Sequence, residues 1–370
     1  MTKQNVALVV GSTGIVGEAL MELLSKPDTQ GGPWKVYGLA RRARPSWLSP
    51  EDLYVQCDLV NKDDCMAKIS PLTDVTHVFW VAWVARQTEV ENCAANGEAF
   101  RNALDALLPV AKGLEHIALQ TGGKQYMGSN EAIVTGKGVI PYDTPYTEDL
   151  PRQPSINFYY TLEDILYETV EKSKGKLTWS VHRPNVIFGL AAGNMLNLLG
   201  SFGVYAAICK HEGIPFTFPG NQLGWDIVCD ASNSDLIAEQ EIWAATDPKA
   251  KNQAYNTVNG DVFKWKKVWK PLAEKLGMEF VPFSGQPIQL GEIMKDKEPV
   301  WDKLVKEHGL YPAKLEDVGQ WWFVKAYLSP AKDMLLNNNK SREFGFSGFR
   351  NTEKSFLAFF DKMRERKLIL

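Results

Sequence analysis

The sequence has few of the residue patterns that build disulfide frameworks or metal sites. Its five cysteines are odd in number and form no Cys-x-x-Cys pair, which predicts free thiols and a reducing compartment. Its five histidines lie far apart and include no His-Glu-x-x-His motif. We therefore expect no metal site.

The chain also lacks a strong charge and long apolar runs. Its formal net charge is -3, so nothing predicts nucleic acid or an anionic membrane surface as a partner. No apolar run is long enough to span a membrane, and the first apolar segment starts so near Met1 that we expect no signal peptide. These absences predict a cytoplasmic protein. Hydrophobic residues make up 45% of the 370 residues, which is enough for a full core.

A glycine-rich segment near the start carries the first functional signal. The apolar run Val6–Val10 predicts a buried parallel strand, and Gly11, Gly14 and Gly17 follow it before a run of helix-forming residues. Such glycines allow a tight exit from the strand, a close approach of the backbone to a pyrophosphate, and packing of the helix on the sheet. The helix N-terminus would bind the phosphate. A turn that merely needs small residues is the alternative, and the flanking strand and helix favour the dinucleotide.

Short apolar segments alternate with helix-forming segments along much of the chain. This alternation predicts an α/β fold, a Rossmann-type doubly wound parallel sheet with a mainly helical C-terminal lid that binds substrate. We expect the dinucleotide-binding core over residues 1–190, completed by about 225–260, and the lid over 191–224 and 261–370. The strands predicted after the first are residues 34–39, 54–59, 75–84 (the fourth strand and its exit), 116–120, 177–182 and 255–259.

The end of the second predicted strand is basic. NAD-binding versions of this fold place an acidic residue there to hold the ribose 2′-hydroxyl. This chain has Arg41 and Arg42 instead, with Arg44 close behind. Two guanidinium groups suit a 2′-phosphate and favour NADPH over NADH. A solvated basic turn is the alternative.

Two further strand ends each have two interpretations. Asp58, followed by Leu59, would contact the adenine or would cap a helix over residues 61–69. The Arg183-Pro184 pair would present its backbone to the nicotinamide carboxamide, as in extended short-chain reductases, or would simply end a strand.

The most informative feature is a lysine that is missing. Ordinary short-chain reductases carry Tyr-x-x-x-Lys on a helix that this chain opens with Tyr159 and Tyr160. The residues four positions later are Glu163 and Asp164. Either the chain has lost reductase activity, or a lysine from elsewhere serves the tyrosine. Lys124, after the fifth predicted strand, is the available candidate.

Together, Phe158-Tyr159-Tyr160 with Glu163-Asp164, the Thr121-Gly122-x-Lys124 loop and Arg41-Arg42 resemble the progesterone 5β-reductase/iridoid synthase family. This family is a plant-centred branch of the extended short-chain dehydrogenases/reductases, and the similarity covers nearly the whole chain. It implies NADPH-dependent reduction of the activated C=C bond of an apolar enone or enal. A carbonyl reductase or epimerase on the same fold, and a non-catalytic NADPH-sensing protein, are the alternatives. A homodimer is permitted.

The resemblance also implies residue roles. Tyr159 and Lys124 would be catalytic, with the ammonium lowering the pKa of the tyrosine and making its hydroxyl a better donor to an enolate oxygen. The implied substrate pocket contains Trp83, Tyr126, Met127, Asn130 and Phe323. The residues expected at the cofactor, from the motifs and the resemblance together, are Gly11, Thr13, Gly14, Ile15, Val16, Gly17, Arg41, Arg42, Asp58, Leu59, Val81, Ala82, Thr121, Tyr159, Pro184, Val186 and Ile187.

The chain departs from the family pattern beside Lys124. Ser129-Asn130 stands where Pro-Phe is usual, and Gln125 stands where histidine is usual. We therefore expect an altered pocket mouth, and the resemblance leaves a steroid, 8-oxogeranial and a small enone all open as the natural substrate.

Overall fold

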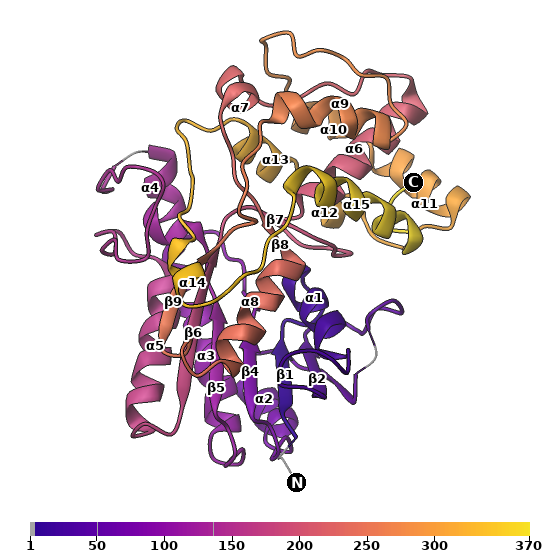
Figure 1. Ribbon diagram of the computed structural model, residues 1–370. Helices are drawn as coiled ribbons and strands as arrows, with labels where there is room; N and C mark the ends of the chain where they lie inside the picture. The colour runs from indigo at the N-terminus through magenta and orange to yellow at the C-terminus, as the bar shows by residue number, and fades with distance from the viewer. Residues whose placement is uncertain (1–3, 50, 136) are drawn as a thin grey trace. The chain divides into compact units, whose positions relative to one another are not determined.

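The computed structural model, which describes residues 4–49, 51–135 and 137–370, divides into two compact units (Figure 1). Unit 1 comprises Met1–Asn185, Asp235–Val258 and Leu336–Gly348. Unit 2 comprises Val186–Ser234, Asn259–Leu335 and Phe349–Leu370. The chain therefore enters each unit more than once.

Unit 1 is built on a seven-stranded sheet in the order β3-β2-β1-β4-β5-β6-β9, and every neighbouring pair of strands is parallel. This order confirms the predicted Rossmann-type sheet. Every residue of β1 is buried, which explains its continuous apolar run. The strands are β1 (Val6–Val10), β2 (Lys35–Ala40), β3 (Leu53–Gln56), β4 (His77–Trp80), β5 (His116–Gln120), β6 (Thr178–Pro184) and β9 (Gln253–Thr257).

Helices pack on this sheet and carry part of the site. Helices α2, α3 and α5 lie side by side over one hydrophobic core, and α1 packs on β1 and β2. A capping box of Thr88 and Glu91 starts α3, and the Asn157 side chain caps α5. The helices are α1 (Ile15–Leu24), α2 (Lys62–Ile69), α3 (Glu89–Leu107), α4 (Asn130–Thr135), α5 (Phe158–Lys172), α8 (Ser234–Thr246) and α14 (Asn339–Glu343), with the 3-10 turn η1 (Gly123–Tyr126).

Two observed boundaries differ from the predicted ones. The third strand ends early, at Gln56, and β4 ends at Trp80 within the segment predicted as the fourth strand and its exit, so the residues after both strands form loops at the sheet edge. Residues 336–348 belong to unit 1, although the sequence places all of 261–370 in the lid. The reason is that Leu336 bridges to Tyr146 and α14 packs against β9.

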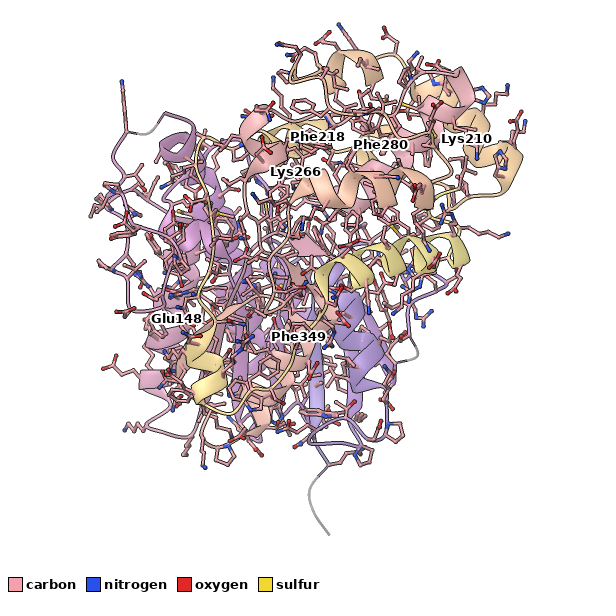
Figure 2. The ribbon with its side chains drawn as sticks, turned by 45° about the horizontal axis from the view of Figure 1, so that its top comes forward. Glu148, Lys210, Phe218, Lys266, Phe280 and Phe349 are labelled. Atoms are coloured by element: carbon pink, nitrogen blue, oxygen red, sulfur yellow. The ribbon has the colours of Figure 1, made fainter. Side chains whose placement is uncertain are left out.

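Unit 2 is mainly helical and has an aromatic core. Trp265 and Trp269 are fully buried. Phe218, labelled in Figure 2, makes edge-on contacts with Trp225 at 5.0 Å and with Trp269 at 5.3 Å between ring centres. Its elements are α6 (Leu198–Glu212), α7 (Gln222–Asp226), α9 (Trp265–Lys275), α10 (Leu290–Met294), α11 (Glu298–His308), α12 (Leu315–Val318), α13 (Trp321–Leu328) and α15 (Thr352–Glu365), with the parallel pair β7 (Ile187–Phe188) and β8 (Ser232–Asn233).

Among the described residues there is neither a membrane-spanning helix nor a metal-binding cluster. Among residues 4–49, 51–135 and 137–370, no helix is both long and apolar enough to cross a bilayer. The same residues contain no group of three or more His, Cys, Asp or Glu side chains arranged to hold a metal ion.

A mostly buried chain of hydrogen bonds runs along β6 in unit 1, between β5 and α8. The Ser180 hydroxyl lies between two imidazoles, 3.0 Å from His116 Nε2 and 2.9 Å from His182 Nε2. His182 Nδ1 is 2.8 Å from Gln240 Oε1, and His116 Nδ1 is 2.9 Å from Thr178 Oγ1. Burial disfavours the charged imidazolium and lowers the pKa of both histidines, that of His182 to about 4. Both rings are therefore neutral at physiological pH.

We expect His182 to make the fold less stable in acid. Its pKa is lowered from 6.5 in a free chain to about 4 in the fold, so the unfolded chain binds more protons between these values. The free energy of unfolding should fall as the pH drops through this window, by about 3 kcal/mol for a shift of this size. In urea unfolding, the stability advantage of the wild type over His182→Gln should shrink from neutral to acidic pH.

The exposed His211, near the end of α6, provides the matched control. His211→Gln should keep the pH dependence of the wild type. If the wild type exceeds His182→Gln in free energy of unfolding by the same amount at neutral and acidic pH, the prediction is contradicted.

Candidate active site

Three of the predicted residues meet at the carboxyl edge of the sheet in unit 1. Trp83 follows β4, Lys124 lies in η1 after β5, and Tyr159 lies in the first turn of α5. The Lys124 ammonium is 5.2 Å from the centre of the Tyr159 ring and 4.5 Å from that of Phe158. The Trp83 ring stacks on Phe158 with the centres 6.0 Å apart. Ligands bind at this edge of open parallel sheets, which makes this group the candidate active site.

The structure adds Glu89, which the sequence analysis missed. Lys124 Nζ donates to Glu89 Oε1 at 2.6 Å, and the Phe158 backbone N–H donates to the same oxygen at 2.8 Å. The side chains of Glu89 and Lys124 are only 1% and 12% exposed. An acidic residue in the first turn of a helix is common, so the sequence offered no signal for this role.

The hydroxyl of Tyr159 is available to a ligand. It makes no hydrogen bond within the part of the chain that the structure describes. It lies against Gly122, where an added Cβ would come within 2.9 Å of the hydroxyl oxygen. Any larger residue at position 122 would therefore displace the phenol.

The neighbouring Tyr160 is a structural residue. Its hydroxyl donates to the Gln125 carbonyl at 2.8 Å and accepts from the Gln153 backbone N–H at 2.9 Å. Both contacts lie within unit 1 and hold α5 to the loops around it. Of the two tyrosines, Tyr159 is therefore the one whose hydroxyl has no hydrogen-bond partner among the described residues, and its catalytic role stays a prediction.

Glu163 occupies the position where ordinary short-chain reductases carry the lysine of Tyr-x-x-x-Lys. Glu163 is buried and accepts from Arg183 at 2.8 Å and from Arg152 at 3.0 Å. It also accepts from the Gln125 side chain at 3.3 Å, and Asp164 pairs with Arg152 at 2.7 Å. These contacts connect α5 to the end of β6 and to η1. A lysine at position 163 would meet two guanidinium groups, so the amine of the site must come from another element.

The electrostatics of the site correct one expectation. Burial and the negative charge of Glu89 raise the pKa of Tyr159 above its usual value. Burial lowers the pKa of Lys124, and the hydrogen bond to Glu89 opposes that effect. The expectation that the ammonium lowers the pKa of Tyr159 is therefore wrong, because burial and the Glu89 charge act in the opposite direction. Tyr159 is a neutral hydrogen-bond donor at physiological pH.

The glycine segment has the shape of a phosphate cradle. Gly11 has a φ of +98°, and a Cβ on it would lie 2.9 Å from the Ala82 nitrogen. A Cβ on Gly17 would lie 2.1 Å from the Gly11 carbonyl oxygen, so neither residue tolerates a side chain. Helix α1 starts at Gly14 with no side-chain cap. The uncapped N-terminus fits the pyrophosphate of a dinucleotide.

Three arginines follow β2, and all three are exposed: Arg41, Arg42 and Arg44. Arg44 is paired with Glu51 and also donates to the Leu48 carbonyl at 2.9 Å. The fit to a 2′-phosphate therefore rests on Arg41 and Arg42.

The structure excludes one interpretation of Asp58, that of a helix cap. Asn61, not Asp58, caps α2, because its side chain accepts from the Asp64 N–H at 3.0 Å. Asp58 Oδ1 accepts the Val60 N–H at 3.3 Å. The role of Asp58 and Leu59 at an adenine stays a prediction.

The loops around the site are held from behind. The Asn96 side chain bonds both the N–H and the carbonyl of Val84 at 2.8 Å, which anchors the loop that carries Trp83 and the predicted Val81 and Ala82. The Thr121 N–H donates to the His182 carbonyl at 2.8 Å.

The other predicted pocket residues lie in different settings. Tyr126 is 2% exposed, and its hydroxyl donates to Asn256 Oδ1 at 2.5 Å. In this structure its side chain therefore anchors η1 to β9. Met127 is half-buried. Asn130 begins α4, and its side chain lies outside the described residues. Three of the remaining predicted residues belong to unit 2: Val186 before β7, Ile187 in β7 and Phe323 in α13. The others, Thr13, Ile15, Val16 and Pro184, lie in unit 1.

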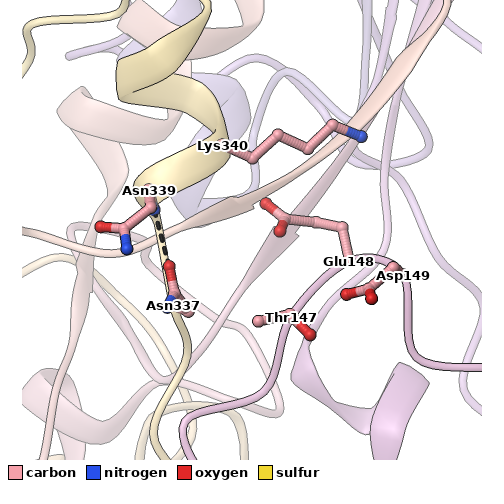
Figure 3. A pocket seen from close by; sticks show the side chains of 6 residues that line it. All are labelled: Thr147, Glu148, Asp149, Asn337, Asn339 and Lys340. Carbon is pink, nitrogen blue, oxygen red and sulfur yellow. Dashed lines mark hydrogen bonds between the residues drawn. The ribbon is translucent and has the colours of Figure 1, made fainter.

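A separate pocket of about 420 Å³ opens in unit 1 (Figure 3). It is lined by Thr147, Glu148, Asp149, Asn337, Asn339 and Lys340, none of which is a predicted site residue. Figure 3 shows the Lys340 ammonium extending away from the Glu148 carboxylate. Burial raises the pKa of Glu148 and lowers that of Lys340. This polar lining does not suit an apolar substrate.

Comparisons with known proteins place the whole chain in one family. A family described as the PRISE-like Rossmann-fold domain matches residues 7–370. An (S)-8-oxocitronellyl enol synthase of Nepeta cataria is 52% identical, over 99% of this chain and 93% of its own. A 3-oxo-Delta(4,5)-steroid 5-beta-reductase of Arabidopsis thaliana is 50% identical over the same shares. The UDP-glucose 4-epimerase of Thermus thermophilus, solved with NAD, has a TM-score of 0.63 at 17% identity, covers 97% of this chain and 99% of its own, and shares the fold.

Removing the amine of the site should destabilise the protein. Lys124→Met leaves the Glu89 carboxylate buried without a cation, which costs about 3–5 kcal/mol. Adding Glu89→Gln should restore part of that loss, since the amide carries no charge and still accepts the Phe158 N–H. Urea unfolding of the wild type, the single variant and the double variant measures both effects.

The exposed pair of Lys172 and Glu168, 2.6 Å apart, is the matched control. Lys172→Met should change stability little, because water screens that pair. A double variant no more stable than Lys124→Met would show that Glu89 carries no buried charge.

Proposed function

From the premise that this chain belongs to the PRISE-like Rossmann-fold family, we propose that it is an NADPH-dependent oxidoreductase that reduces the activated C=C bond of an enone or enal. The observation that carries this proposal is the Tyr159 hydroxyl, which has no partner among the described residues and lies near the Lys124–Glu89 pair. A carbonyl oxygen that gains negative charge is the partner that such a donor suits.

The proposed cofactor is assigned to the glycine cradle and the basic strand end. Gly11, Gly14 and Gly17 would admit the pyrophosphate at the N-terminus of α1. Arg41 and Arg42 would hold the 2′-phosphate through charge-assisted hydrogen bonds. When bound, NADPH supplies the hydride.

Tyr159 would act on the carbonyl oxygen of the substrate. Reduction of an enone at its β-carbon places negative charge on that oxygen, and one positioned donor is worth about 3 kcal/mol there. Because the pKa of Tyr159 is raised, the phenol keeps its proton and stabilises the enolate through a hydrogen bond. The α-carbon then takes its proton from solvent.

The other residues of the site would shape its surroundings. The Lys124 ammonium lies near the phenol ring and adds a positive charge close to the developing enolate. Trp83 and Phe158 stack and would form an apolar wall beside the bound substrate, which strengthens these interactions.

We also propose a cytoplasmic location. Its support is the set of free thiols, since the five cysteines of the described chain form no disulfide.

Loss of the Tyr159 hydroxyl should abolish most activity. Tyr159→Phe should lower kcat for enone-dependent NADPH oxidation by about a hundredfold, the value of one oxyanion donor, and should keep NADPH binding. Lys124→Met should behave in the same way. A panel of steroid, monoterpenoid and small enones, with identification of products, measures this, since an alcohol product would instead indicate carbonyl reduction.

Tyr160 is the matched control. Tyr160→Phe removes a hydroxyl that makes two hydrogen bonds within the fold, so it should lower the Tm and change kcat only a few-fold. Wild-type activity in Tyr159→Phe, or equal losses in the two variants, would remove the proposed role of Tyr159.

Arg41 and Arg42 should determine the choice of cofactor. Arg41→Ala with Arg42→Ala should raise the Kd for NADPH at least about tenfold, since each charge-assisted hydrogen bond contributes about 1.5–3 kcal/mol. The Kd for NADH should stay unchanged. Arg44→Ala, whose guanidinium is held by Glu51, should leave both values unchanged. An equal rise in the Kd values for NADPH and NADH would contradict the assignment of Arg41 and Arg42 to the 2′-phosphate.

A further inference from the structure

We propose that Glu89 is a positioning residue of the site, which holds the Lys124 amine in its charged form and places it beside Tyr159. This inference rests on the proposed function, because it assigns a role within the same site. Its physical content, the charge state of one amine, can be measured without substrate.

The geometry of one carboxylate oxygen is the first support. Glu89 Oε1 accepts from Lys124 Nζ at 2.6 Å and from the Phe158 N–H at 2.8 Å. Phe158 is the first residue of α5 and Tyr159 the second. The same oxygen therefore sets the position of the amine and of the helix turn that carries the phenol.

The burial of Glu89 is the second support. Its side chain is 1% exposed, and Oε2 has no hydrogen-bond partner within the described part of the chain. Lys124 is its ion-pair partner there, so separating the pair would carry a large desolvation cost. Lys124 cannot swing away from Tyr159 to another acceptor without leaving this carboxylate unpaired.

The surroundings of the amine show why a carboxylate is needed. The aromatic rings of Phe158 and Tyr159 lie close to Lys124 Nζ. The titratable groups that act on it are Glu89 and Cys93 of α3, Glu131 of α4 and the phenol of Tyr159 on α5. Burial among these groups lowers the pKa of Lys124, and Glu89 is the largest influence that raises it.

Removing the charge of Glu89 should therefore let the amine lose its proton at a lower pH. In the cofactor-free full chain, the rate at which acetic anhydride acylates Lys124 reports the fraction of free amine. Peptide mass spectrometry resolves this site from the other lysines. In Glu89→Gln the midpoint of that rate should move down by at least about one pH unit.

Glu131→Gln is the matched control. Glu131 is exposed, and its carboxylate accepts the Glu89 backbone N–H at 3.1 Å. The variant removes a neighbouring charge without touching the amine, so its midpoint should move by less than half as much. An unshifted midpoint in a folded Glu89→Gln, or an equal shift in Glu131→Gln, would overturn the proposal.

A second variant covers the case in which Glu89→Gln does not fold. Glu89→Asp keeps the charge and withdraws it by one methylene, so the midpoint should move down by a smaller amount. A midpoint identical to that of the wild type would again overturn the proposal.

The pH dependence of kcat/KM separates positioning from simple structural support. In Glu89→Gln the rate of enone reduction should fall as the pH rises through the lowered pKa of Lys124, in a range where the wild type is flat. Glu89→Asp should restore part of the flat range. If no enone is reduced by any variant while the acylation midpoint shifts, the proposed function fails and the role of Glu89 in charging the amine stands. If enones are reduced and the midpoint does not move, the role of Glu89 fails alone.

Discussion

A carboxylate that is hidden from water requires a cation beside it, and the arrangement of this site follows from that requirement. Glu89 supplies the carboxylate and Lys124 the cation. Because the same oxygen also accepts the Phe158 N–H, the pair joins the start of α3, the turn η1 and the first turn of α5. These three elements lie in different parts of the sequence, and the ion pair holds their ends together where a ligand would bind.

The displaced lysine is the feature that sets this site apart from an ordinary short-chain reductase. The helix position that would carry it holds Glu163, which is buried and bonded to Arg183 of β6. That pairing gives α5 a rigid attachment to the sheet but fills the place with an ion pair of its own. An added amine could not be stable beside those guanidinium groups, and the turn after β5 provides the amine near the Tyr159 ring instead.

The pattern of hydrogen bonds separates residues that look alike. Buried polar groups in folded proteins nearly always have partners, and Tyr160 follows that rule with two. Tyr159 is its neighbour in the chain, yet its hydroxyl is turned to Gly122, which has no side chain to bond. Tyr159 is only half-buried, so its hydroxyl is left to bond water or a ligand.

The sequence by itself determined the sheet, the glycine cradle and the basic end of β2, because burial on both faces and close backbone approach leave marks on adjacent residues. It also singled out Tyr159 and Lys124, through the departure from Tyr-x-x-x-Lys and the family motifs. Only the tertiary structure decided which tyrosine hydroxyl is available, that residues 336–348 return to unit 1, and that Glu89 partners Lys124. Glu89 is 35 residues from Lys124 and 69 from Phe158. An acidic residue at a helix start looks ordinary in sequence, and its charge acquires a function only when folding removes it from water.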